Sequence, residues 1–115
     1  MTLQEDSGLV VIVEDPFIRS FLRTLLTRAG HRTVELSPQQ GVDLVGSGKV
    51  HVKALITNTP ELFRSVAGEL PLIYTTSNPD PDATQGFAQC HVLRKPFQAG
   101  QLLDALNEVS ATVIP

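Results

Sequence analysis

Five apolar residues in succession, Leu9 to Val13, are followed at once by two carboxylates, Glu14 and Asp15. A half-exposed strand alternates apolar with polar residues, so the unbroken run predicts a strand buried on both faces, as in a parallel sheet. In open α/β sheets, ligands bind at the carboxyl ends of the strands. The two acids therefore predict an oxygen-rich site suited to a hard cation such as Mg²⁺. Asp15 is equally placed to cap a helix that begins at Pro16, a role for which Glu14 is not needed.

The rest of the chain alternates between predicted helices and strands. Further strands are predicted at Arg32 to Leu36, Val50 to Thr57, Pro71 to Thr76 and His91 to Arg94. Helices are predicted at Pro16 to Ala29, from Ser37-Pro38 to Gly46, from Pro60 to Ala67, in a short turn at Ala83 to Phe87, and from Gln98 to Val109. Five strands alternating with five helices predict a doubly wound α/β fold, with a parallel sheet ordered 2-1-3-4-5 and the first strand central.

Composition indicates one soluble domain. The 115 residues suit a single domain spanning 1–115, with its core at about 9–109, and 42% apolar residues argue against disorder. A net charge of −3 provides no electrostatic footprint for nucleic acid or an anionic membrane. The single cysteine, Cys90, excludes an internal disulfide and fits a reducing, cytoplasmic compartment. We expect Cys90 to be a small buried hydrophobe.

A family resemblance is carried by four short segments and by their order along the chain. They are Val-Val-Ile-Val-Glu-Asp, Leu-Ile-Thr-Asn-Thr-Pro, Leu-Pro-Leu-Ile-Tyr-Thr-Thr-Ser and Val-Leu-Arg-Lys-Pro-Phe. Each segment is weak alone, but their order and spacing make a specific signal. From Leu9 to about Val109, the chain resembles the receiver domain of bacterial response regulators, the modules of two-component phosphorelay signalling, which have a flavodoxin-like fold.

The resemblance implies a role for each strand end. In the family, an acid pair, an aspartate after the third strand and a backbone carbonyl bind Mg²⁺, and the aspartate accepts a phosphoryl group from a phosphohistidine. Glu14 and Asp15 match the acid pair, and Pro60 matches the carbonyl. Thr76 and Lys95 match the residues that bind the phosphoryl oxygens, and the peptide between Lys95 and Pro96 is expected to be cis.

The position of the phosphoacceptor is occupied by Asn58. A carboxamide is a poor nucleophile and a weaker Mg²⁺ ligand than a carboxylate, so the site has lost its acceptor and one negative charge. Asn58 is then a structural hydrogen-bonder, with Asp15, Lys95 or a backbone carbonyl as its partner. Thr76 has the alternative role of satisfying a backbone group. Lys95 either retains anion binding or pairs with one of the two acids.

Other departures from the family agree with this interpretation. The loop after Asp15 is one residue shorter than the family's, and the predicted fourth helix is shortened by about a turn. The family's aromatic switch residue, three positions before the lysine, falls on Val92. We therefore predict a non-enzymatic pseudo-receiver that needs no cofactor, with weak or absent Mg²⁺ binding at Glu14, Asp15 and Pro60.

The resemblance also implies partners. We expect a histidine kinase or an output domain to bind this module, with no nucleic acid or membrane contact. Homodimers in the family form through the fourth helix, fifth strand and fifth helix, a surface that here would include Val92, Arg94, Gln101 and Asp104. One alternative is a phospho-accepting receiver whose aspartate was exchanged for Asn58 to trap the unphosphorylated form. Another is a small-ligand sensor that uses the acidic crevice, which a cavity beside Lys95 and Thr76 would favour.

Overall fold

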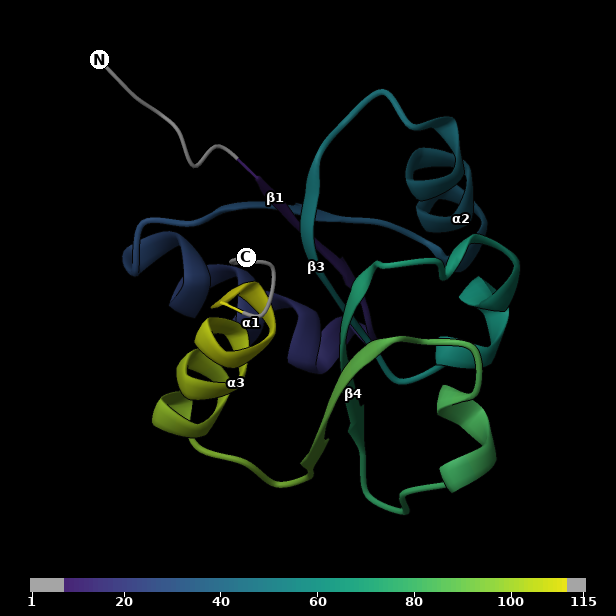
Figure 1. Cartoon of the computed structure of the whole chain (residues 1–115). Helices are drawn as coiled ribbons and strands as arrows, with labels where there is room; N and C mark the ends of the chain where they lie inside the picture. Colours follow the sequence, from purple (N-terminus) through teal and green to yellow (C-terminus); the bar gives the residue numbers. More distant parts are fainter. Residues whose placement is uncertain (1–7, 112–115) are drawn as a thin grey trace.

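The computed structural model describes residues 8–111, which form a five-stranded parallel sheet between two layers of helices (Figure 1). The strand order is β2-β1-β3-β4-β5, which confirms the predicted topology. The strands are β1 (Leu9–Val13), β2 (Arg32–Glu35), β3 (Val52–Thr57), β4 (Pro71–Thr76) and β5 (Gln89–Arg94).

Strand β1 lies inside the sheet, between β2 and β3. Val11 is in register with Val34 on one side and with Leu55 on the other. Val10, Val11 and Ile12 have no solvent exposure. Helices on both faces of the sheet explain the unbroken apolar run, because they leave no solvent-exposed face for a polar residue.

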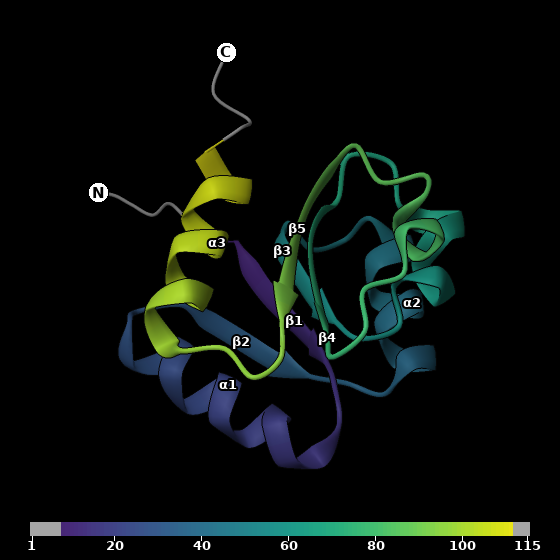
Figure 2. The ribbon, with the colours of Figure 1, turned by 90° about the horizontal axis from the view of Figure 1, so that it is seen from below.

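Three α-helices and two 3₁₀ helices cover the sheet. They are α1 (Pro16–Arg28), α2 (Pro38–Ser47), η1 (Pro60–Val66), η2 (Pro81–Thr84) and α3 (Ala99–Ala111). Helices α1 and α3 lie on one face, and α2, η1 and η2 lie on the other (Figure 2). Within residues 8–111, no helix combines the length and apolarity needed to cross a membrane.

The third and fourth of the five predicted helices are 3₁₀ helices. In both segments the backbone forms i→i+3 hydrogen bonds: the N–H of Leu62 donates to the carbonyl of Thr59 over 3.1 Å, and that of Ala83 to Asp80 over 3.0 Å. Segments of seven and four residues give little room for i→i+4 bonding, and short pieces of this kind commonly adopt the tighter helix.

Each face of the sheet has its own apolar core. The cluster under α1 and α3 consists of Val10, Ile12, Leu22, Leu26, Ala54, Ile56, Ile73, Leu93, Leu102, Ala105, Leu106 and Val109. The cluster under α2, η1 and η2 consists of Val11, Val13, Leu55, Phe63, Leu70, Leu72, Tyr74 and Ala83. We call the first side the α1/α3 face and the second side the α2/η face.

The edge strand β5 differs from its prediction in two ways. It begins at Gln89, two residues before the predicted start at His91. Cys90 is exposed, so the expectation of a buried cysteine is wrong. Along β5 only Leu93 is buried, on the α1/α3 face, whereas Cys90 and Val92 lie on the opposite side, where the short helix η2 leaves them open to solvent.

Candidate functional site

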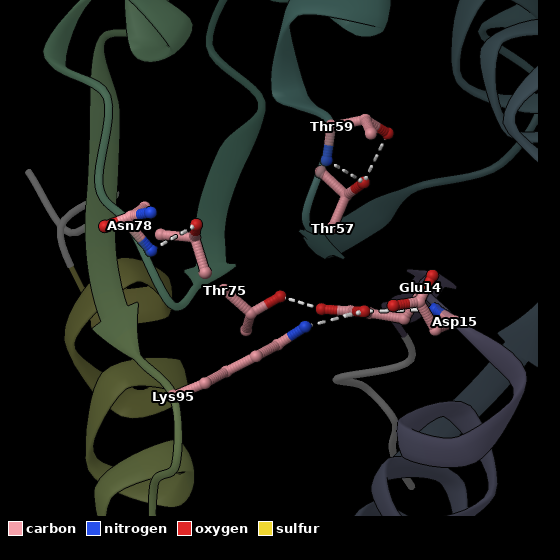
Figure 3. A network of polar contacts seen from close by, with 8 residues as sticks. Glu14, Asp15, Thr57, Thr59, Thr75, Asn78 and Lys95 are labelled. Atoms are coloured by element: carbon pink, nitrogen blue, oxygen red, sulfur yellow. Dashed lines mark hydrogen bonds and ion pairs between the residues drawn. The ribbon is translucent and has the colours of Figure 1, made fainter.

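Three polar side chains meet on the α1/α3 face at the carboxyl ends of the strands. Side chains two residues apart in a strand share a face. Glu14 therefore continues the side of Ile12, Thr75 that of Ile73, and Lys95 that of Leu93. Ile12, Ile73 and Leu93 belong to one buried cluster, the core beneath the three polar residues. Figure 3 shows Thr75 and Lys95 directed at the carboxylate of Glu14.

The Glu14 carboxylate is buried and surrounded by donors. Its side chain has no solvent exposure, while that of Lys95 is 20% exposed. The Lys95 ammonium lies 3.2 Å from Glu14 Oε1, and the backbone N–H of Asp15 donates to the same oxygen over 3.0 Å. The Thr75 hydroxyl donates to Oε2. A buried charge needs a partner and hydrogen bonds, and here the carboxylate has both. The prediction that Lys95 pairs with one of the acids is confirmed.

The second acid, Asp15, stands apart from this network. It is exposed and occupies the N-cap position of α1, but its side chain makes no capping hydrogen bond. Its backbone carbonyl instead accepts a bond from the N–H of Arg19 over 2.9 Å. The two adjacent carboxylates therefore differ in environment: Glu14 is buried and compensated, and Asp15 is in solvent.

The hydrogen bonds to Glu14 compete with a Mg²⁺ ion for its carboxylate oxygens. Magnesium takes one or two carboxylates in near-octahedral geometry and usually keeps several waters. Both oxygens of Glu14 already accept hydrogen bonds, from Lys95, Thr75 and the Asp15 backbone. Across residues 8–111, no group of three His, Cys, Asp or Glu side chains is placed to hold a metal.

Asn58, at the predicted phosphoacceptor position, takes no part in the hydrogen bonds around Glu14. Asn58 is half-buried, and within the described part of the chain its carboxamide forms no hydrogen bond, so neither proposed side-chain partner, Asp15 nor Lys95, is engaged. Polar contacts nearby are local: the Thr57 hydroxyl accepts the N–H of Thr59 over 3.0 Å. Asn58 does not replace an acid in the pairing with Lys95, because Glu14 takes that role.

Of the two adjacent threonines at the end of β4, sequence reasoning singled out Thr76. In the structure the Thr76 hydroxyl accepts the backbone N–H of Asn78 over 3.1 Å, a local role of the kind considered for it. Thr75 is the buried residue that contacts Glu14. The missed signal is the alternation of β4, which places Thr75, not Thr76, on the same face as Ile73.

Two more predicted residues can be placed. The peptide between Lys95 and Pro96 is cis, as expected. Val92 is in register with Tyr74 and is 45% exposed, so the position predicted for an aromatic switch carries an aliphatic side chain that is open to solvent. On the same strand, partial burial raises the pKa of the Cys90 thiol, and a hydrogen bond with the Thr84 side chain lowers it by less.

Comparison with known proteins rests on structure. No protein-family model matches the chain, and no curated protein matches it in sequence. The structure is similar to a response regulator receiver protein from Burkholderia phymatum, with a TM-score of 0.74 and 24% identity over 90% of this chain and 95% of that one. It is similar to a receiver protein from Sinorhizobium medicae WSM419, with a TM-score of 0.74 and 18% identity over 93% and 96% of the two chains.

A third similar structure is the receiver domain of a sensor histidine kinase from Pseudomonas aeruginosa PAO1, which has a magnesium ion coordinated in its active-site cleft. The TM-score is 0.76 and the identity 17%, over 91% of this chain and 98% of that one. With the strand order β2-β1-β3-β4-β5, these similarities show that the chain has the flavodoxin-like fold of response-regulator receiver domains.

Proposed function

We propose that this chain is a pseudo-receiver, a protein-interaction module of two-component signalling that works without accepting a phosphoryl group. The observation that carries the proposal is the state of the Glu14 carboxylate. It is buried and engaged by Lys95 and Thr75, so the crevice is held in one arrangement by the chain's own groups. A crevice closed in this way has no need of a phosphoryl group or a cation to balance its charge.

The chemistry of the acceptor position points the same way. Phosphoryl transfer to a receiver needs a carboxylate oxygen that attacks phosphorus and forms an acyl phosphate. Asn58 offers a neutral carboxamide in that place. Glu14 has a carboxylate, but both of its oxygens accept hydrogen bonds inside the crevice. The module is therefore non-enzymatic and is proposed to act by binding.

The proposed partner is a signalling protein, either a histidine kinase or an output domain. The similar domain from Pseudomonas aeruginosa is part of a sensor histidine kinase, which makes this partner class a natural choice. The surface formed by η2, β5 and α3 could make such contacts, or contacts with a second copy of the chain. Its exposed side chains are apolar, basic, neutral polar and acidic: Val92, Arg94, Gln101 and Asp104. We place this function in the cytoplasm.

Intact-mass spectrometry after incubation with acetyl phosphate and Mg²⁺ tests the proposal. We expect no added phosphoryl mass on the Asn58 protein, and an added base-labile phosphoryl group would refute it. The variant Asn58→Asp restores a nucleophile and a third anion, but we expect slow and incomplete labelling because Lys95 remains paired with Glu14. Rapid, complete labelling of Asn58→Asp would favour the alternative of a phospho-accepting receiver with an exchanged aspartate.

A further inference from the structure

A cavity of about 460 Å³ opens beside Lys95 on the α1/α3 side of the molecule. It lies between the first turns of α1 and the loop that follows β5, and it is lined by Ile18, Phe21, Ser77, Lys95, Pro96 and Phe97. We propose that this cavity is a binding site for a small, uncharged, ring-shaped molecule that carries a carbonyl oxygen. The site goes beyond the proposed function and does not depend on whether the chain accepts a phosphoryl group.

The walls of the cavity are apolar and aromatic. The rings of Phe21 and Phe97 have centroids 6.4 Å apart and are tilted by 52° to each other. Ile18 and Phe97 pack against the core beneath α1 and α3, so two of the walls are anchored. A volume of this size lies within the roughly 300–1,000 Å³ of small-molecule sites, which are mostly apolar with a few placed polar groups. The walls therefore suit a flat hydrocarbon ring.

Two of the lining residues, Lys95 and Ser77, carry hydrogen-bond donors. A lysine ammonium carries three N–H donors, and the contact from Lys95 to Glu14 accounts for one of them. Ser77 is exposed, and its hydroxyl is a second donor on the lining. A ligand carbonyl oxygen can accept from both groups while the Lys95–Glu14 pair stays intact. That contact would fix the orientation of a ring packed against the exposed sides of the two phenylalanines.

Charge selects an uncharged ligand. Glu14 offsets the charge of Lys95 at 3.2 Å. An anion would therefore gain little from a lysine that is already paired. A cation would lie next to the Lys95 ammonium, and two neighbouring positive charges repel each other. A neutral acceptor avoids both costs.

The probes that test this inference are benzamide, benzoate and benzamidinium, which share one shape and differ in charge. Each is titrated into the full chain, labelled with ¹⁵N, and followed by NMR. We expect benzamide to shift the amides of Ser77, Lys95 and Phe97 with a dissociation constant of about 1 mM, typical of a fragment. Benzoate and benzamidinium should bind at least about fivefold more weakly. Equal or tighter binding of either ion would overturn the assigned ligand class.

Matched variants locate the site. Phe21 is 45% exposed and Leu62, on η1 across the sheet, is 48% exposed, so alanine at either position removes an exposed side chain of similar accessibility. Phe21→Ala should weaken benzamide binding by roughly fivefold or more, and Leu62→Ala should leave it unchanged. Ser77→Ala should weaken it by about threefold. Benzamide shifts that are absent at about 10 mM, scattered over the surface, or retained in Phe21→Ala would overturn the site.

The tests of this site and of the proposed function fail independently. If the protein gains a phosphoryl group from acetyl phosphate and still binds benzamide at Ser77 and Phe97, the pseudo-receiver is refuted and the cavity site stands. If the protein gains no phosphoryl group and does not bind benzamide, the cavity site is refuted and the pseudo-receiver stands.

Discussion

The two faces of the sheet are covered to different extents. On the α1/α3 face, two helices of 13 residues each pack over a core that extends from Val10 to Val109. On the α2/η face, the cover over β3, β4 and β5 is reduced to 3₁₀ helices of seven and four residues. Solvent reaches Cys90 and Val92 on that side of β5 as a result.

The difference separates the candidate site from the reduced part of the fold. The contacts among Glu14, Thr75 and Lys95 lie on the fully covered face, above buried apolar residues. The reduced face carries the exposed Val92, at the position predicted for an aromatic switch residue. A switch needs an element with two arrangements that a ligand can bias. We infer that this chain combines a crevice held by the contacts of Glu14 with an opposite face on which the helical cover is short. Variants on each side test the two features separately.

The largest expected effect is on the crevice. Lys95→Met removes the charge that compensates a carboxylate with no solvent exposure, and breaking a buried pair in this way costs about 3–5 kcal/mol. Because Lys95 is partly exposed, we expect a loss of about 3 kcal/mol in the free energy of unfolding. Urea denaturation at neutral pH measures it.

Two further variants show whether the loss comes from the uncompensated charge. Glu14→Gln combined with Lys95→Met keeps an acceptor for Thr75 without a buried charge, so most of the lost stability should return. Arg23→Met is the control, since Arg23 is 64% exposed and its pair with Glu35 at 3.5 Å should contribute less than about 1 kcal/mol. Equal losses for Lys95→Met and Arg23→Met would contradict a buried, compensated Glu14.

An intermediate effect is expected on the reduced face, where Arg64 of η1 holds η2. Its guanidinium donates to the carbonyls of Asp82 and Gln85 over 2.8 and 3.1 Å. Arg64→Ala should lower local stability by about 1 kcal/mol, which speeds hydrogen exchange of the η2 amides several-fold. The neighbouring exposed residue provides the control variant, Ser65→Ala, which should leave the exchange unchanged. Unchanged exchange in Arg64→Ala would show that η2 is held by other contacts.

The smallest effect concerns the thiol on the same face. Partial burial of the Cys90 thiol raises its pKa, so the reactive thiolate fraction at neutral pH is lower than in a free cysteine. Alkylation by iodoacetamide should therefore be slower than for N-acetylcysteine, and its pH profile should shift upward. Thr84→Val removes a hydrogen bond that lowers this pKa and should shift the profile further up. A downward shift in either protein would contradict the assigned environment.

Much of the fold could be predicted because its signals are local. The unbroken run from Leu9 to Val13 requires cover on both faces, and β4 begins and ends at the predicted residues, Pro71 and Thr76. The pairing of Lys95 with an acid was predictable because both follow parallel strands, whose carboxyl ends share one edge of the sheet.

Other features depend on long-range arrangement. Thr75 and Thr76 are chemically the same. The face of the sheet on which each side chain lies decides which hydroxyl contacts Glu14. Cys90 is exposed because the four-residue helix η2 covers little of β5. The residues of β5 carry no signal for the extent of that cover. The cavity next to Lys95 needs Phe21 and Phe97, from opposite ends of the chain, at a ring distance of 6.4 Å.

A calorimetric Mg²⁺ titration tests the central claim, a crevice closed by its own side chains, most directly. Both oxygens of Glu14 are engaged and Asn58 supplies no charge, so the protein should show no binding at submillimolar Mg²⁺. Asn58→Asp adds an anion and should bind the ion weakly, because ligand charge tunes affinity. Submillimolar binding by the Asn58 protein, abolished in Glu14→Gln, would contradict the account, because it would mean that the carboxylate leaves Lys95 for the metal.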